Sequence, residues 1–142
     1  MSLFRIFDIA GSGMSAQSVR LNTVASNLAN VDSVSSSEDK TYKARQPVFA
    51  AAMEDLRRQV YPNQAESVGV KVTGIVESDI PLQQEYRPDH PQANEQGMIF
   101  KTNVNAMSEM ANMISASRAY QINVEISDTA KQLAMRTLTL GQ

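Results

Sequence analysis

The chain has 142 residues, a formal net charge of −2, no Cys, no Trp and a single His. Its length suits one domain of ordinary size. The absence of Cys excludes disulfide scaffolds and thiolate metal sites, and one His removes almost every His-based triad, relay or zinc site, because such sites need several converging ligands. The small charge disfavours non-specific binding to nucleic acid or acidic membranes. Composition favours an interaction protein over a catalyst, and no cofactor is expected.

No transmembrane helix or cleaved secretory signal is expected. The uncharged runs near the N-terminus, residues 9–19 and 21–31, are short and rich in Ser, Asn, Thr and Gln. Arg5 and Asp8 lie where the apolar region of a secretory signal would be. These features predict a cytosolic protein or one that is exported with its N-terminus intact.

Charge is distributed unevenly along the chain. Residues 1–34 have no net charge, residues 35–100 carry 7 basic and 10 acidic side chains for a net −3, and residues 101–142 have a net charge of +1. Two weakly charged arms therefore flank a more charged and more irregular centre. This partition suggests that the two arms belong together.

The N-terminal arm carries apolar residues at alternating steps of four and three. The series comprises Leu3, Phe7, Ala10, Met14, Leu21, Val24, Leu28 and Val31, with Gln17 as its one polar member. Such spacing places the side chains along one narrow seam, as in coiled-coil packing. Gly11 and Gly13 weaken a helix by about 1 kcal/mol each relative to Ala. We therefore predict a helix over 14–31, with 3–10 as a hinged or separately ordered piece.

The C-terminal arm is predicted to form a longer helix that Asn105 caps and Gly141 closes. Val124, Met135 and Leu138 fall on a second side, so we expect the helix to pack against the N-terminal arm on one side and against something else on another. Its main apolar series comprises Met107, Met110, Ala111, Ile114, Ala119, Ile122, Ile126, Ala130, Leu133, Thr137 and Leu140.

The centre contains shorter signals. The Ser-rich stretch 31–40 is typical of a loop. Apolar residues at Phe49, Met53, Leu56 and Val60 predict a short helix over 49–60 that Pro62 ends. Alternating Val residues predict a strand over 68–76, with 82–86 as its partner and 98–101 as a third strand. Three short strands need a helix or another subunit for stability.

Motifs for chemistry are weak. Gly11-Ser12-Gly13 resembles a phosphate loop superficially, but Ala16 replaces the third glycine of the dinucleotide fingerprint and no Lys-Ser/Thr follows. His90 is expected to be a hydrogen-bonded loop residue. The central carboxylates, among them Asp79 and Glu85, have no repeated spacing that would support acid/base catalysis. The sequence therefore offers no set of catalytic residues for a small hydrolase. Two interpretations remain open for the Met107, Met110, Met113 and Ile114 cluster: an adaptable binding face or ordinary core.

Residues 12–33, SGMSAQSVRLNTVASNLANVDS, resemble the N-terminal signature of the bacterial flagellar axial proteins, in which Met-x-Ala-Gln precedes Asn-x-x-Ala-x-Asn-x-Ala-Asn. Residues 103–142 are similar to FlgC-type proximal rod proteins of the flagellar basal body, with Ala-Ser-Arg-Ala-Tyr-Gln at 116–121 as the most specific part. Two departures are the intervening VDSVSSSEDK before Thr41-Tyr42, which fits a proximal rod protein, and Ala106 where the pattern often has Pro.

The resemblance implies an α+β protein whose terminal helices pair as an antiparallel coiled coil, with a small β-rich insert between them. Residues 1–34 together with 103–142 would form the coiled-coil polymerisation domain, and residues 35–102 the central insert. It also implies a structural subunit of the proximal rod, with no enzymatic activity, that polymerises with itself and other rod proteins into a periplasmic drive shaft. Export through the flagellar type III apparatus would explain the missing cleavable signal.

We expect the two arms to be weakly ordered in the monomer and to be fixed by neighbouring subunits. The alternative is a cytosolic coiled-coil adaptor or export chaperone. Residues expected to contact other subunits are Leu3, Phe7, Met14, Leu21, Val24, Leu28, Met107, Met110, Ile114, Tyr120, Ile122, Ile126, Leu133 and Leu138.

Overall fold

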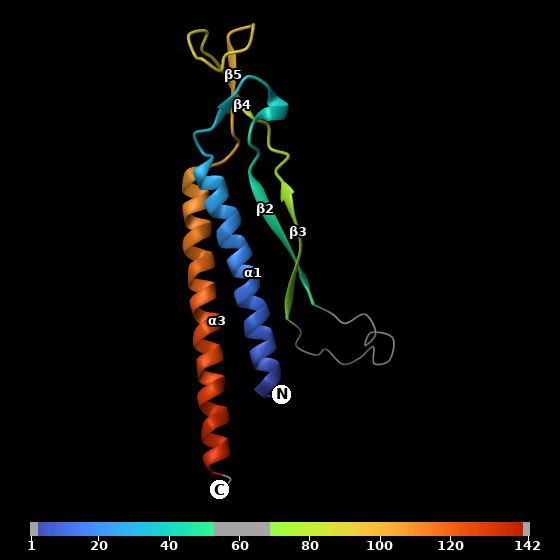
Figure 1. Ribbon diagram of the computed structural model, residues 1–142, viewed down its shortest axis with the longest axis vertical. Coiled ribbons are helices and arrows are strands. Elements are labelled where there is room, and N and C mark those ends of the chain that lie inside the picture. Colours follow the sequence, from blue (N-terminus) through green and yellow to red (C-terminus); the bar gives the residue numbers. More distant parts are fainter. Residues whose placement is uncertain (1–2, 53–68, 141–142) are drawn as a thin grey trace, which may run out of the picture. The chain divides into compact units, whose positions relative to one another are not determined.

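The computed structural model describes residues 3–52 and 69–140 (Figure 1). Two long helices enclose a β-rich centre in sequence, which agrees with the α+β prediction. The elements in chain order are α1 (Leu3–Ala29), β1 (Val34–Ser35), the short 3-10 helix η1 (Glu38–Lys40), β2 (Arg45–Ala51), β3 (Val70–Glu77), β4 (Gln83–Tyr86), β5 (Met98–Lys101) and α3 (Ala106–Leu140).

The chain divides into two compact units. Unit 1 draws on residues 1–19, 48–74 and 115–142, and unit 2 on residues 20–47 and 75–114. Each long helix therefore contributes one segment to each unit. We describe the two units separately.

Unit 1 is held together through small residues and one serine. The Ser12 hydroxyl donates to the Ile9 carbonyl at 2.8 Å and accepts the Val70 N–H at 3.1 Å, which ties the first residue of β3 to α1. A Cβ on Gly13 would lie 2.9 Å from the Asn123 amide nitrogen, so glycine lets α3 approach closely. Among the residues of this unit that the structure describes, the buried apolar ones are all alanines: Ala10, Ala16, Ala116 and Ala130.

Unit 2 contains a three-stranded antiparallel sheet in the order β1-β5-β4. Ile99 in the central strand lies opposite Glu85 of β4 and is among the most deeply buried large side chains described. Gly97, just before β5, has φ +75°, a left-handed conformation that favours glycine, and its carbonyl accepts the Arg87 N–H at 2.8 Å. These contacts hold the 87–97 turn against the sheet.

The predicted strand pairing needs correction. Strand β3 pairs with β2 in a separate two-stranded sheet, and β4 pairs with β5, so 82–86 is not the partner of 68–76. Residues 49–51 lie in strand β2 rather than in the predicted helix, whose remaining residues from 53 lie outside the described ranges. The stretch 31–40 contains β1 and η1 rather than loop alone. Short apolar runs carry no information on their pairing partner, which tertiary contacts decide.

Helix α1 is continuous from Leu3, so the predicted hinge before residue 14 is wrong. The glycines lower the intrinsic helix propensity, but Ser12 and Gly13 contact Val70 and Asn123, and these tertiary contacts outweigh that cost. The predicted cap of the second helix is confirmed. The Asn105 Oδ1 accepts the Ser108 N–H at 3.0 Å, as expected for an N-cap.

The prediction that the helices form an antiparallel coiled coil is wrong. Helix α3 buries Glu109, Ala116 and Ala130, whereas most large apolar residues of the predicted series are exposed. In unit 2 the helices contact each other through polar side chains, including Arg20 Nη2 to Asn112 Oδ1 at 3.0 Å. Small and polar residues let helix backbones approach closely, and they leave no row of large apolar knobs at the contact. No helix within the described ranges has an apolar stretch long enough to span a membrane.

Candidate functional site

Large apolar side chains are exposed along the segment of α3 in unit 2. Met107 is 76% exposed, and Met110 and Ile114 are at least half exposed. The cap at Asn105 fixes where the helix begins and so which residues of its first turns are left outside. Met107 and Met110 are therefore not core residues of this chain, which argues against the interpretation of the methionine cluster as ordinary core.

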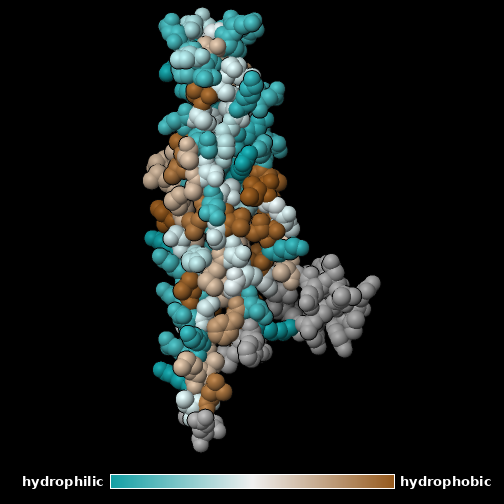
Figure 2. Space-filling model, viewed as in Figure 1, coloured by the Kyte–Doolittle hydropathy of each residue, from teal (hydrophilic) through white to brown (hydrophobic). Residues whose placement is uncertain are grey.

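The segment of α3 in unit 1 has its own exposed apolar row. Ile122, Ile126 and Leu133 are between 42% and 55% exposed. At about 100° per residue these three lie on one side of the helix, because steps of four and seven residues nearly complete whole turns. Tyr120 and Leu138 are exposed elsewhere on the same segment. Figure 2 shows apolar side chains open to solvent over α3.

The predicted contact residues of α1 behave differently. Val24 is buried within unit 2, so it is a core residue of this chain. Phe7, Met14, Leu21 and Leu28 are half-buried. The side chain of Leu3 lies outside what the structure describes. Of the two helices, α3 therefore carries the larger share of the exposed apolar surface, and strands β2 and β3 expose Val48, Phe49, Ile75 and Val76 as well.

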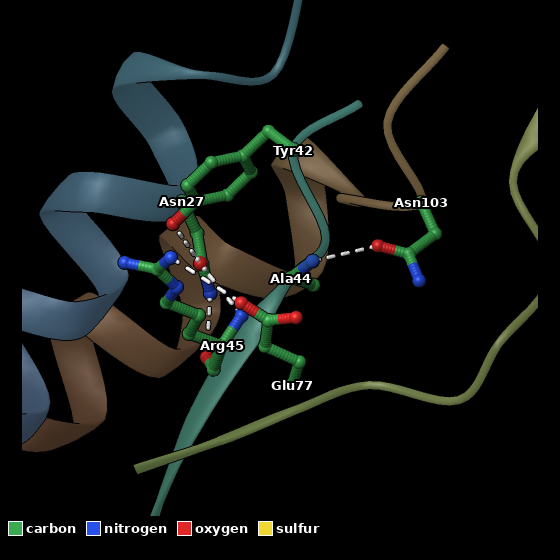
Figure 3. A network of polar contacts seen from close by, with 6 residues as sticks. All are labelled: Asn27, Tyr42, Ala44, Arg45, Glu77 and Asn103. Carbon is green, nitrogen blue, oxygen red and sulfur yellow. Dashed lines mark hydrogen bonds and ion pairs between the residues drawn. The ribbon is translucent and has the colours of Figure 1, made fainter. Parts of the chain in front are cut away.

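Sequence reasoning missed the residue that organises unit 2, Asn27. Its side chain is only 1% exposed and uses its full hydrogen-bonding capacity, of which Figure 3 shows the bonds to Tyr42 and Arg45. The amide nitrogen donates to the Arg45 carbonyl at 2.8 Å and to Glu109 Oε2 at 3.0 Å. The amide oxygen accepts the Tyr42 hydroxyl and the Arg45 N–H, each at 2.9 Å. One asparagine thus joins α1, the start of β2 and α3.

A second asparagine extends this network to the residues that follow β3. Asn103 Oδ1 accepts the Ala44 N–H at 2.7 Å, and its amide nitrogen donates to the Ile80 carbonyl at 2.7 Å. The Ser78 N–H donates to the Ala44 carbonyl at 2.8 Å. Both residues could have been singled out by their place in the sequence. Asn27 lies in Ala-Ser-Asn-Leu-Ala-Asn, and Asn103 lies just before the helix cap.

Two side chains of unit 2, Tyr42 and Glu85, have shifted pKa values. Partial burial raises the pKa of Tyr42, while Arg45, whose guanidinium carbon lies 5.4 Å from the centre of the Tyr42 ring, opposes that shift. On the exposed β4, hydrogen bonds from Lys101 and Arg87 lower the pKa of Glu85. The shift at Glu85 therefore comes from neighbours on β5 and in the following turn, whereas the shift at Tyr42 comes first from burial.

The part of the chain that the structure describes contains no group of three or more His, Asp or Glu side chains placed to hold a metal ion. His90 is a hydrogen-bonded loop residue, as predicted, since its Nδ1 accepts the Gln92 N–H at 3.1 Å. The two candidate functional features are the buried hydrogen-bond network around Asn27 and the exposed apolar face of α3.

Comparison with known proteins accounts for both ends of the chain. A family model described as Flagella basal body rod protein matches residues 7–35, and one described as Flagellar basal body rod FlgEFG protein C-terminal matches residues 95–140. The flagellar basal-body rod protein FlgC of Salmonella typhimurium is 46% identical over 142 residues, which are 100% of both chains. Those of Yersinia enterocolitica and of Buchnera aphidicola subsp. Acyrthosiphon pisum are 47% and 43% identical, again over 100% of both chains.

The chain belongs to the FlgC family of flagellar basal-body rod proteins. The predicted resemblance is thereby confirmed over the whole sequence. FlgC-family membership identifies the chain as a structural rod subunit, and it does not support the alternative of a cytosolic adaptor or export chaperone. The family is structural and is not a known enzyme family.

Proposed function

We propose that this rod subunit polymerises through the exposed apolar face of α3 into the proximal rod, the periplasmic shaft that carries torque from motor to hook. The observation that supports this proposal is the row Ile122, Ile126 and Leu133, half exposed on the segment of α3 whose buried residues, Ala116 and Ala130, are small. Contiguous exposed apolar surface on a soluble protein marks interaction sites. Burying the exposed half of each side chain contributes about 1 kcal/mol.

The subunit has no catalytic role in this proposal. Residues 1–34 and 103–142 act as the polymerisation segments, and residues 35–102 as the insert between them. Contacts of the head-to-tail kind repeat without closing and so build an open helical tube. Partners are other copies of the chain and other rod proteins, and delivery to the rod runs through the flagellar type III export apparatus.

The remaining predicted contact residues take part to different degrees. Leu21 and Leu28 are half-buried and keep some surface for a neighbour, whereas Val24 stabilises unit 2 from within. We infer that association adds to the stability of helices that are joined mainly through small and polar side chains in the single chain.

Replacing Ile122 with Asp tests the proposal. The variant places a charge on the exposed apolar row, so we expect normal synthesis and helicity but no complete rods and no swimming. Gln121→Asp is the matched control, because Gln121 is exposed, adjacent and polar, and placing Asp there costs at least as much helix propensity as placing it at position 122. Leu21→Asp is expected to block assembly as well. Immunoblots measure protein level, and electron microscopy of purified basal bodies scores rods. Intact rods with Ile122→Asp would refute the proposed interface.

A further inference from the structure

An open cavity of about 490 Å³ lies within unit 2. Its wall is formed by the segment that follows α1, by β1 and η1, and by the start of β2 together with Glu77 at the end of β3. The volume falls in the range of small-ligand sites, about 300–1,000 Å³. Such sites are usually lined by apolar side chains, but among the described residues that line this cavity Val34 is the only aliphatic one. The cavity therefore suits a polar ligand.

The small hydroxyl groups of the wall are held by bonds within the chain. The Ser33 hydroxyl donates to the Asn30 carbonyl at 2.8 Å. The hydroxyls of Ser35 and Thr41 bond to each other, and both are 2.8 Å from the Ser37 carbonyl. Because these bonds use the hydroxyl hydrogens, the hydroxyl oxygens have only acceptor capacity left. A ligand that matches this wall brings O–H or N–H donors.

The charged residues of the wall have both signs. Lys40, Lys43 and Arg45 are basic, whereas Asp39 and Glu77 are acidic. Arg45 and Glu77 pair with each other at 3.3 Å (Figure 3). In the part of the chain that the structure describes, the side chains of Lys40, Lys43 and Asp39 make no ion pair or hydrogen bond. Two ammonium groups and one carboxylate are thus left for a ligand, and positive charge prevails in a cavity of an otherwise acidic insert.

We propose that this cavity binds a carboxylated saccharide. The ligand carboxylate pairs with the ammonium groups of Lys40 and Lys43, since charge-assisted hydrogen bonds are the stronger ones. The ligand hydroxyls donate to Asp39 and to the hydroxyl oxygens of the wall. This site is separate from the proposed polymerisation face, because none of its described lining residues belongs to α3.

The mixture of groups favours such a ligand over simpler ones. An acidic peptide gains from the two lysines, but it is repelled by Asp39 and Glu77 and brings no hydroxyl donors for the serine and threonine oxygens. A neutral saccharide supplies hydroxyl donors and leaves the two ammonium groups without a counter-charge. A saccharide with one carboxylate satisfies both sets of groups at once.

Titration of the full-length, ¹⁵N-labelled chain, followed by the NMR signals of its backbone amides, tests the proposal. The probes are a glucuronic acid–glucose disaccharide, the neutral disaccharide cellobiose and a tri-glutamate peptide. We expect saturable shifts of the amides in residues 33–43 with the acidic disaccharide. Cellobiose should bind about fivefold more weakly, as expected for the loss of exposed charge pairs, and tri-glutamate more weakly still.

Charge-removing variants assign the effect to the cavity. Lys40→Gln combined with Lys43→Gln should weaken binding of the acidic disaccharide by about tenfold and leave cellobiose binding unchanged. Lys71→Gln combined with Lys131→Gln is the matched control, because both lysines are exposed and lie outside the cavity. The control removes the same net charge and should leave the affinity for both disaccharides unchanged.

Several results would overturn the proposal. Tri-glutamate that binds as tightly as the acidic disaccharide would make the cavity a site for acidic peptides. Equal affinity for the two disaccharides, or an undiminished affinity in the Lys40 and Lys43 variant, would remove the role of the lysines. Saturable shifts that lie outside residues 33–43, or no saturable shifts with any probe, would show that the cavity is not a saccharide site.

Discussion

Asn27→Ala is the most informative single change in unit 2. The side chain makes four hydrogen bonds, two as donor and two as acceptor, and is almost fully buried. Alanine removes all four and leaves the Arg45 backbone groups and the buried Glu109 carboxylate without this partner. At about 0.5–1.5 kcal/mol net for each hydrogen bond, we expect a loss of about 3–4 kcal/mol in the free energy of unfolding.

Such a loss is large for a protein of this size, since total stabilities are about 5–15 kcal/mol. It corresponds to a fall in melting temperature of about 10 °C. Circular dichroism of the purified chain during thermal and urea unfolding measures both quantities. The change also removes the tie between the start of β2 and the two helices, so proteolysis within residues 42–45 should become faster.

Asn30→Ala is the matched control at the end of the same helix. Asn30 is joined by its amide nitrogen to the Ser26 carbonyl at 2.8 Å in an exposed bond, and Ser33 bonds to the Asn30 main chain, which alanine keeps. We expect a loss below about 0.5 kcal/mol. If Asn27→Ala and Asn30→Ala destabilise the chain equally, the Asn27 network does not hold unit 2 together.

Two further predictions concern stability. Burial raises the folded-state pKa of Tyr42 above 10.0, so its contribution to the free energy of unfolding is fully present below pH 10 and is lost as pH rises through the folded-state pKa. Urea unfolding midpoints between pH 8 and 11 should therefore fall less for Tyr42→Phe than for the parent chain, and parallel curves would exclude this cause. Gly11→Ala meets no atom within 4 Å and should stabilise α1 by about 0.5–1 kcal/mol, whereas Gly13→Val drives a branched side chain into the Asn123 amide and should destabilise the chain by about 1 kcal/mol. Urea unfolding of both variants measures the difference, and stabilisation by Gly13→Val would mean that the Asn123 side chain moves aside freely.

Local sequence signals predicted the elements that depend on local interactions. Asn105 was identified as a cap because an asparagine oxygen satisfies free N–H groups of a following helix wherever the chain goes. The strands 70–77 and 98–101 follow alternating or apolar runs bounded by turn residues. Family membership was likewise readable from the motifs at 12–33 and 103–142, which the full-length relatives confirm.

Pairing between segments was not readable in the same way. Nothing local distinguishes β2 from β4 as the partner of β3, because the choice of partner depends on contacts between segments that are distant in sequence. Asn27 was overlooked because a polar residue in a helix gives no sign of its four partners, which come from segments up to 82 residues away. The hinge at Gly11 was predicted from propensity alone, and the contacts of Ser12 and Gly13 override it.

The sequence by itself determined that α3 is a long helix with more than one apolar side, and that the chain is a rod protein. Only the tertiary structure decided which side faces inward. Ile122 and Ile126 were expected to contact other subunits, while the sequence did not show which side of α3 is buried within the chain; the buried residues are Glu109, which accepts a hydrogen bond from Asn27 of α1, and the small Ala116 and Ala130. Helical periodicity reports that side chains share a face, whereas burial depends on how closely two backbones can approach, and small residues allow the closer approach.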